Sequence, residues 1–287
     1  MEVAAADIMW RRTISQGNFR YTTILCDGDS KTFIHLEKQN IYNGIPLVRE
    51  QCVNHVKKRM TTALHEEIKK AKAQKITLGG NKKGALTDKC IKHLSNYYLS
   101  CIKRNKNNVE KMRTEVLATL AHCSSTDEKH DHSLCPKGEK SWCFFNKATA
   151  LGLRPPTHNN MPVFLNSTVN ERLKPIFERL SKTELLAGCS QGLTQNANEG
   201  LHSVVWRLCP KTIFVSKDKI EIAAAKGVAH FNLGALKTAE LYKKQALTDN
   251  AIKIFNSQDL KRQRQSDIKS SIEEKKDALI TSMRKKM

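Results

Sequence analysis

Apolar residues recur at helical spacing along most of this chain. In residues 49–73 an apolar side chain returns every three or four positions, at Val53, Val56 and Met60, which is typical of one face of an α-helix. The same pattern predicts helices over 2–15, 86–104, 109–122, 167–187, 195–208 and 219–247. Pro175 is expected to interrupt the helix over 167–187, and Gly234 is expected to break the helix over 219–247.

One stretch has the pattern of a β-strand. Residues 19–26 (FRYTTILC) are rich in β-branched and aromatic side chains, and Asp27-Gly28-Asp29-Ser30 follows as a turn. No other segment shows a convincing strand pattern. The expected fold class is therefore mainly α with a small β component.

The distribution of charge changes this picture of a plain helical protein. The chain has 49 Lys and Arg against 28 Asp and Glu, a formal net charge of +21. Residues 57–113 hold sixteen of the basic residues and four of the acidic ones, a net charge of +12. So concentrated a charge is most often a surface for nucleic acid, because contacts to phosphates release counterions. The alternatives are a solvated basic face and an acidic protein partner.

The overall composition excludes several other classes of protein. Apolar residues make up 39% of the chain, which is too many for a disordered or collagen-like protein. No stretch approaches the ~18 uncharged apolar residues of a membrane span, and residues 1–8 lack the pattern of a secretory signal. We therefore expect an intracellular protein whose nine cysteines are thiols or metal ligands.

A basic loop, GGNKKG, lies inside the charged segment at residues 79–84. The loop lacks the spacing of a phosphate-binding P-loop, but its small residues would let backbone amides approach DNA phosphates. The residues expected to contact DNA are Lys57, Lys58, Arg59, Lys82, Lys83, Lys103 and Arg104.

Residues 122–143 contain a concentration of Cys and His. Tetrahedral zinc takes four nitrogen or sulfur ligands, and a polar loop with few apolar side chains needs some other means of stabilisation. The set with a suitable type and number of ligands is His122, His132, Cys135 and Cys143. Structural Zn²⁺ is one interpretation of this set, and unligated core or surface residues are the other.

Three further sites contain residues that could bind a metal or act in catalysis, and each also has an ordinary structural interpretation. Asp27 and Asp29 follow the predicted strand, where carboxylates can hold a divalent cation or simply form a turn that caps a helix. Cys52 and His55, at spacing i, i+3, could bind a metal from one helix face or be plain buried residues. Glu199 lies in the polar first turn of a predicted helix, as many exposed carboxylates do.

Seven segments of the chain carry motifs that occur together in one order. They are YTTILCDGDSKTF (21–33), EQCVNHVKKRM (50–60), LGGNKKGALTDK (78–89), NYYLSCIKRN (96–105), STDEKHDHSLCPKGEKSWC (125–143), TQNANEGLHSVVW (194–206) and CPKTIFVSKDKIEIA (209–223). In this order they resemble the Mutator-like transposases, a DDE transposase family with an RNase H-like catalytic core. The resemblance spans most of residues 1–240.

The resemblance implies a role for each matching residue. Asp27, with Asp29 as its neighbour, matches the second catalytic carboxylate, and Glu199 matches the third, on a helix that follows a large insertion. Cys52 and His55 match the CxxH element at the start of that insertion. Such a site would bind two Mg²⁺ or Mn²⁺ ions, one to activate water or a DNA 3′-hydroxyl and one to stabilise the leaving oxygen.

The first catalytic Asp of the family has no counterpart here, because Glu2 and Asp7 are the only acidic residues before Asp27. We therefore expect an N-terminally truncated copy with an incomplete RNase H-like core. Its expected function is that of a transposase-derived DNA-binding protein, related to DNA strand cleavage and transfer but inactive alone. The alternative is a non-catalytic, zinc-stapled module that binds nucleic acid or protein.

The expected organisation has four parts. They are a partial core with Asp27 (1–48), a helical basic insertion with the Cys/His loop (49–190), core helices with Glu199 (191–247) and a charged helical tail (248–287). The expected partner is DNA, with no membrane and a possible homo-oligomer, and the expected location is the nucleus.

Overall fold

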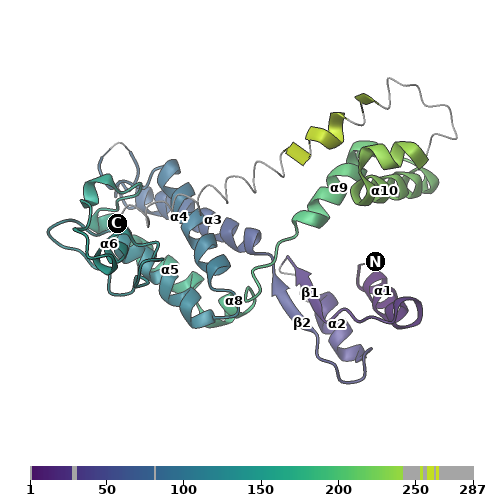
Figure 1. Ribbon diagram of the computed structural model, residues 1–287, viewed down its shortest axis with the longest axis horizontal. Helices are drawn as coiled ribbons and strands as arrows, with labels where there is room; N and C mark the ends of the chain where they lie inside the picture. Colours follow the sequence, from purple (N-terminus) through teal and green to yellow (C-terminus); the bar gives the residue numbers. More distant parts are fainter. Residues whose placement is uncertain are drawn as a thin grey trace. The chain divides into compact units, whose positions relative to one another are not determined.

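The fold was described from a computed structural model of the 287-residue chain (Figure 1). The structure describes residues 2–27, 31–80, 82–241, 253–254, 257–261 and 263–264. They fall into two compact units, Met1–Gln195 and Asn196–Met287. Most of the predicted tail lies outside the described residues, and the four predicted domain ranges stay a prediction. The described chain is mainly α with a small β component, as predicted.

The β component of the first unit is a two-stranded parallel sheet. Strand β1 (Thr23–Cys26) pairs with β2 (Val48–Gln51), in a register that sets Thr23 opposite Val48 and Cys26 opposite Gln51. The predicted strand over 19–26 is therefore confirmed only in its second half. The expectation of a single strand was wrong, because β2 carries Arg49 and Glu50, which are residues that rarely mark a strand.

Two helices pack beside this sheet. Helix α1 (Glu2–Gly17) contacts α2 (Lys31–Gln39), which connects the two strands. Trp10, Leu36 and Tyr42 are buried between them, and the Trp10 indole donates a hydrogen bond to the carbonyl of Tyr21 at 3.1 Å. These contacts form a small hydrophobic core, separate from the main one.

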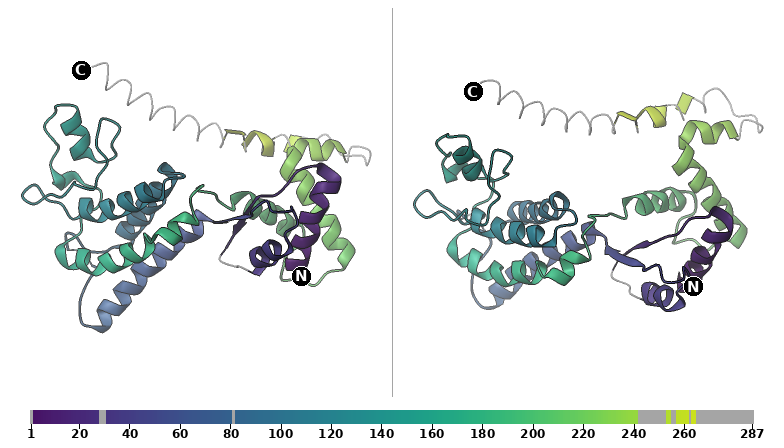
Figure 2. Two further views of the ribbon diagram at one scale, coloured as in Figure 1. Left: turned by 90° about the horizontal axis from the view of Figure 1, so that it is seen from below. Right: turned by 60° about the horizontal axis from the view of Figure 1, so that its bottom comes forward.

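The main core of the first unit is a bundle of helices (Figure 2). Its members are α3 (Val53–Ala73), α4 (Asp88–Arg104), α5 (Val109–Cys123), α7 (Ser167–Leu180) and the short α8 (Thr183–Ala187). Thr87, Asn108 and Asn166 each cap the start of a helix by accepting a backbone N–H bond. Burying the apolar faces against one another holds the bundle together.

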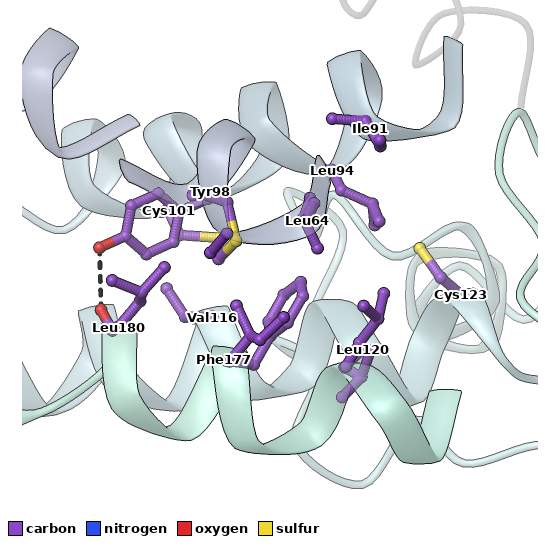
Figure 3. Packing of buried hydrophobic residues seen from close by; sticks show 14 of the residues in the cluster. Leu64, Ile91, Leu94, Tyr98, Cys101, Val116, Leu120, Cys123, Phe177 and Leu180 are labelled. Carbon is purple, nitrogen blue, oxygen red and sulfur yellow. Dashed lines mark hydrogen bonds between the residues drawn. The ribbon is translucent and has the colours of Figure 1, made fainter. Parts of the chain in front are cut away.

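Fully buried side chains fill the centre of this bundle (Figure 3). Leu64, Leu94, Val116 and Phe177 come from four different helices and lie in one cluster. Because the apolar stripe of each helix meets the others here, the helical periodicity of the sequence was a sound guide to this part of the fold.

Two sequence expectations about these helices were wrong. The helix predicted over 49–73 begins only at Val53, since residues 48–51 form β2. Pro175 does not interrupt α7, and the break before α8 comes at residues 181–182 instead. Glu171 and Pro175 are both exposed, so water can satisfy the carbonyl that proline leaves without a helical N–H partner.

A long connection between α5 and α7 carries the Cys/His loop. It contains the short helix α6 (Phe144–Ala150) and a 3₁₀ turn, η1 (His158–Asn160). The backbone N–H of Leu165 donates to the carbonyl of Cys123 at 2.8 Å. This bond returns the connection to the end of α5, so the loop is held at both ends.

The second unit contains α9 (Asn196–Leu208) and α10 (Lys217–Leu241), which pack against each other. The predicted break at Gly234 is confirmed, because its φ of 84° and ψ of 176° are not helical. That backbone region is essentially restricted to glycine. Among the described residues, no helix is both apolar enough and long enough to span a membrane.

Candidate functional site

The carboxylate of Asp27 lies directly after β1 and faces the first turn of α3. Its Oδ1 is 2.5 Å from Nδ1 of His55, and the Asp27 side chain is 61% exposed. The CxxH histidine therefore contacts the strand-end acid. This contact fixes one oxygen of a carboxylate that is otherwise open to solvent.

The other CxxH residue has a different partner. Cys52 is the residue before α3 and is almost fully buried, and its Sγ accepts a bond from the backbone N–H of Gln195 at 3.5 Å. The side-chain amide of Gln195 donates a second bond, to the carbonyl of Leu25 at 3.3 Å. Gln195 is thus bonded through its backbone to the residue before α3 and through its side chain to β1.

An open cavity of about 460 Å³ adjoins the strand-end acid. Its lining includes Asp27, His55, Lys58, Arg59 and Arg179. Three cationic side chains from two helices therefore line the cavity together with two carboxylates, Asp27 and Glu66. Arg179 was not among the sequence candidates, because it lies on α7, far along the chain from the charged segment.

The remaining predicted DNA-contacting residues have varied surroundings. Lys57 donates to Asn96 at 2.7 Å, Lys83 donates to Asn159 at 2.9 Å, and Arg104 forms an ion pair with Glu115 at 3.0 Å. Lys82 and Lys103 are exposed. Their contact with DNA stays a prediction.

The other two predicted catalytic acids are Asp29 and Glu199. Asp29 falls outside the described residues. Glu199 is an exposed residue of the first turn of α9, in the second unit. The convergence of Asp27 and Glu199 on shared metal ions stays a prediction.

The four predicted zinc ligands come together in the first unit. One ligand atom from each of His122, His132, Cys135 and Cys143 lies within 4.8 Å of all the others. His132, Cys135 and Cys143 are buried, and His122 is half-buried. This His₂Cys₂ cluster could bind a metal ion such as zinc.

The distances inside the cluster fit a tetrahedral ion. Zinc with bonds of about 2.0–2.1 Å to nitrogen and 2.3 Å to sulfur separates two nitrogens by about 3.3 Å, and nitrogen from sulfur by about 3.6 Å. Nδ1 of His122 and Nδ1 of His132 are 3.3 Å apart. Sγ of Cys143 lies 3.5 Å from His132 Nδ1, and Sγ of Cys135 lies 3.8 Å from His122 Nδ1.

The pKa shifts of Cys143 and His132 favour the forms that bind a metal, whereas the shift of Cys135 favours the protonated thiol. Hydrogen bonds from Cys135 and His122 hold the pKa of Cys143 well below the usual range of a thiol, against the opposing effect of burial. The bond to Cys143 in turn raises the pKa of Cys135. Burial lowers the pKa of His132, which favours the neutral imidazole. Thiolate and neutral imidazole are the forms that bind zinc.

Neighbouring side chains hold the ligands in place. Trp142 and Phe145 pack against Ala118 and the two cysteines, so these aromatic residues anchor the loop. The Asn146 amide donates to the carbonyls of His132 and Cys135, each at 3.2 Å. The loop therefore has a small hydrophobic core and polar supports of its own.

Two residues near the cluster were missed by sequence reasoning. His158 Nε2 lies 3.0 Å from Nε2 of the ligand His132, and its Nδ1 lies 2.6 Å from Oδ1 of Asp127. His158 is 26 positions beyond His132, outside any local ligand spacing. A further histidine shortly after the loop was the only signal in the sequence that could have suggested it.

Comparison with known protein families assigns the chain. The family model of the Mutator-like transposases matches residues 1–143, about half of the chain. This chain is a Mutator-like transposase family member. The match to the Mutator-like transposases contains Asp27, Cys52, His55 and the whole His₂Cys₂ cluster, whereas Glu199 lies beyond it. No curated protein and no solved structure matches the chain.

Proposed function

We propose that this transposase-related chain binds DNA, and that a phosphate of the DNA backbone occupies the cavity beside Asp27. The observation that carries the proposal is the lining of that cavity by Lys58, Arg59 and Arg179 next to a strand-end carboxylate. Cationic side chains supply most of the affinity for DNA, because each phosphate contact releases counterions. The net charge of +12 over residues 57–113 extends the same attraction.

We further propose that Asp27 and Glu199 are the family's second and third catalytic carboxylates. Both residues stand at the matching positions of their motifs in the resemblance to the family, and Asp27 lies within the residues that the family model matches. Carboxylate oxygens suit Mg²⁺ or Mn²⁺, which would activate the attacking oxygen and stabilise the leaving one.

The 287-residue chain on its own is proposed to bind DNA without cutting it. The family mechanism uses a third carboxylate, and Glu2 and Asp7 are the only acids before Asp27. The nucleus is the proposed place of action. A homo-oligomer is compatible with this proposal.

DNA affinity of a charge-deleted variant tests the role of the cavity. The variant Lys58→Ala/Arg59→Ala/Arg179→Ala should bind duplex DNA more weakly, with a salt slope smaller by about 0.9 because the contact with one phosphate is lost. The matched control Lys129→Ala/Lys137→Ala/Lys140→Ala removes the same charge from exposed positions of the Cys/His loop. Equal losses in both variants would contradict a phosphate site at the cavity.

The His₂Cys₂ cluster favours a second function, that of a zinc-stapled module. We propose that one structural Zn²⁺ per chain holds the loop on α5, because two histidines and two cysteines each place one ligand atom within 4.8 Å of the others. Metal analysis should give about one zinc per chain, and Cys135→Ser/Cys143→Ser should lose it. Cys209→Ser, a buried cysteine of the second unit, is the control. A folded native chain without metal would contradict the zinc site.

A further inference from the structure

A continuous chain of hydrogen bonds leads from the metal cluster to the protein surface. It runs from Nε2 of His132 to Nε2 of His158 at 3.0 Å, and from Nδ1 of His158 to Oδ1 of Asp127 at 2.6 Å. His132 and His158 are both buried, whereas the Asp127 side chain is about half exposed. The two imidazole planes differ by only 16°, as in-plane ring-to-ring bonds require.

We propose that Asp127 and His158 are positioning residues for this metal centre, which hold His132 with Nδ1 directed at the metal ion. The proposal rests on the zinc site proposed above. It assigns two residues outside the four-ligand set, and it makes Thr157 and His158 part of the same centre.

The position of each proton in this chain of hydrogen bonds follows from the Asp127 carboxylate at its outer end. An ionised carboxylate only accepts, so the proton between Asp127 and His158 belongs to Nδ1 of His158. In the neutral His158 imidazole Nε2 is then the acceptor, and Nε2 of His132 must donate to it. His132 therefore keeps a lone pair on Nδ1, the atom 3.5 Å from Cys143 Sγ and 3.3 Å from His122 Nδ1.

Asp127 is itself held in place for this task. Its Oδ2 accepts from the Thr157 hydroxyl at 2.6 Å, and its Oδ1 accepts from the backbone N–H of His158 at 2.8 Å. These bonds keep the pKa of Asp127 well below its usual range. An acid that merely lay on the surface would not be fixed by three bonds from one short segment.

Aromatic rings leave His132 little freedom apart from this chain. Phe145 stacks on His132 with ring centroids 4.5 Å apart and an interplanar angle of 22°. Stacking restrains the plane of the ring but does not choose which nitrogen carries the proton. The bond to His158 determines that Nε2 of His132 carries the proton. Fixing the protonated nitrogen is the usual role of an outer partner at a histidine metal ligand.

The experiment is a Co²⁺ and Zn²⁺ titration of the full chain and of three variants. Asp127→Ala and His158→Ala should each bind both metals about 10–100-fold more weakly, as loss of an outer partner does elsewhere. His158→Gln should restore part of the affinity, because its amide can accept from His132 and donate to Asp127. The control is His130→Ala, which removes a ring stacked on His132 and lying outside the hydrogen-bond chain.

Two readouts separate positioning from folding. Circular dichroism of the metal-free chains should be the same for Asp127→Ala and the native protein. The absorption bands of bound Co²⁺ should shift in Asp127→Ala and His158→Ala, since the basicity and orientation of a ligand change, and should not shift in His130→Ala.

The outcomes distinguish the two proposals. A native chain that gives no tetrahedral Co²⁺ spectrum would overturn the zinc site itself. A native chain that binds Co²⁺, with Asp127→Ala and His158→Ala binding equally tightly, would overturn the positioning role alone. Equal weakening by His130→Ala would also overturn it, because ring packing would then explain the loss.

Discussion

Glu50 is the one acidic side chain that is buried among the residues the structure describes. It lies on β2 opposite Leu25, and its carboxylate accepts bonds from the Ser190 hydroxyl at 2.8 Å and the Gln191 backbone N–H at 3.3 Å. These bonds tie the segment after α8 to the sheet. Burial nevertheless raises the pKa of Glu50 above its ordinary value of 4.5, since the two bonds only partly offset desolvation.

This raised pKa predicts a pH-dependent loss of stability. The folded chain binds the Glu50 proton more tightly than the unfolded chain, so the stabilisation is complete below pH 4.5 and is lost as the pH rises through the raised pKa. Glu50→Gln does not titrate there. The free energy of unfolding of Glu50→Gln, relative to the native chain, should therefore increase between pH 4.5 and 7, by about 1.4 kcal/mol for each unit of pKa shift. Parallel urea-denaturation profiles across this range would contradict the prediction.

At the scale of elements, the helices could be predicted from the local periodicity of apolar residues, whereas the sheet could not. Helix α4 was predictable because its apolar residues recur on one face and Thr87 caps its start. Strand β2 was missed because its four residues gain their structure from parallel pairing with β1, which lies far away in sequence. The RNase H-like assignment stays a prediction for the same reason, since a two-stranded sheet is compatible with many folds.

One buried hydrogen bond links helices α4 and α7, and a single substitution can remove it. The fully buried Tyr98 of α4 donates its hydroxyl to the carbonyl of Leu180, at the end of α7, at 2.8 Å (Figure 3). Tyr98→Phe should lower the free energy of unfolding by about 1–2 kcal/mol, because it leaves a buried carbonyl without a partner. The neighbouring Tyr97 is only half-buried, so Tyr97→Phe is the control and should change stability less. Chemical denaturation measures both, and equal effects would contradict the assignment.

The break in α10 gives a second prediction at this scale. Gly234 has a φ of 84°, and an added Cβ would lie 3.2 Å from the Asp259 carboxylate, which accepts the N–H of Ala235 at 2.9 Å. Gly234→Ala should destabilise the second unit by about 1–3 kcal/mol, because the backbone conformation strains any residue with a Cβ. Thermal melts followed by circular dichroism would detect this. The control is Gly79→Ala, where the nearest atom to an added Cβ is 3.8 Å away.

At the scale of the whole molecule, the candidate sites differ in how far the sequence determines them. The His₂Cys₂ quartet was predictable because its ligand types and number fit zinc within one loop. His158, Asp127 and Arg179 were not, since only the folded chain brings them to the His₂Cys₂ cluster or the Asp27 cavity. The family motifs implied Asp27 and the CxxH residue His55 as two separate elements, and the fold brings the two side chains into contact.

The last prediction concerns catalysis by the 287-residue chain. With Mn²⁺ and supercoiled plasmid, the chain should retard DNA but produce no nicked circles, because a two-metal site needs a further carboxylate beside Asp27 and Glu199. Asp7 is poorly suited to supply it, since it pairs with Arg11 at 2.8 Å and with His35 at 3.4 Å. Gel analysis of plasmid forms measures the outcome, with Glu199→Ala as the comparison. Nicking by the native chain that Glu199→Ala abolishes would mean that these two acids suffice, and that the chain is an active nuclease.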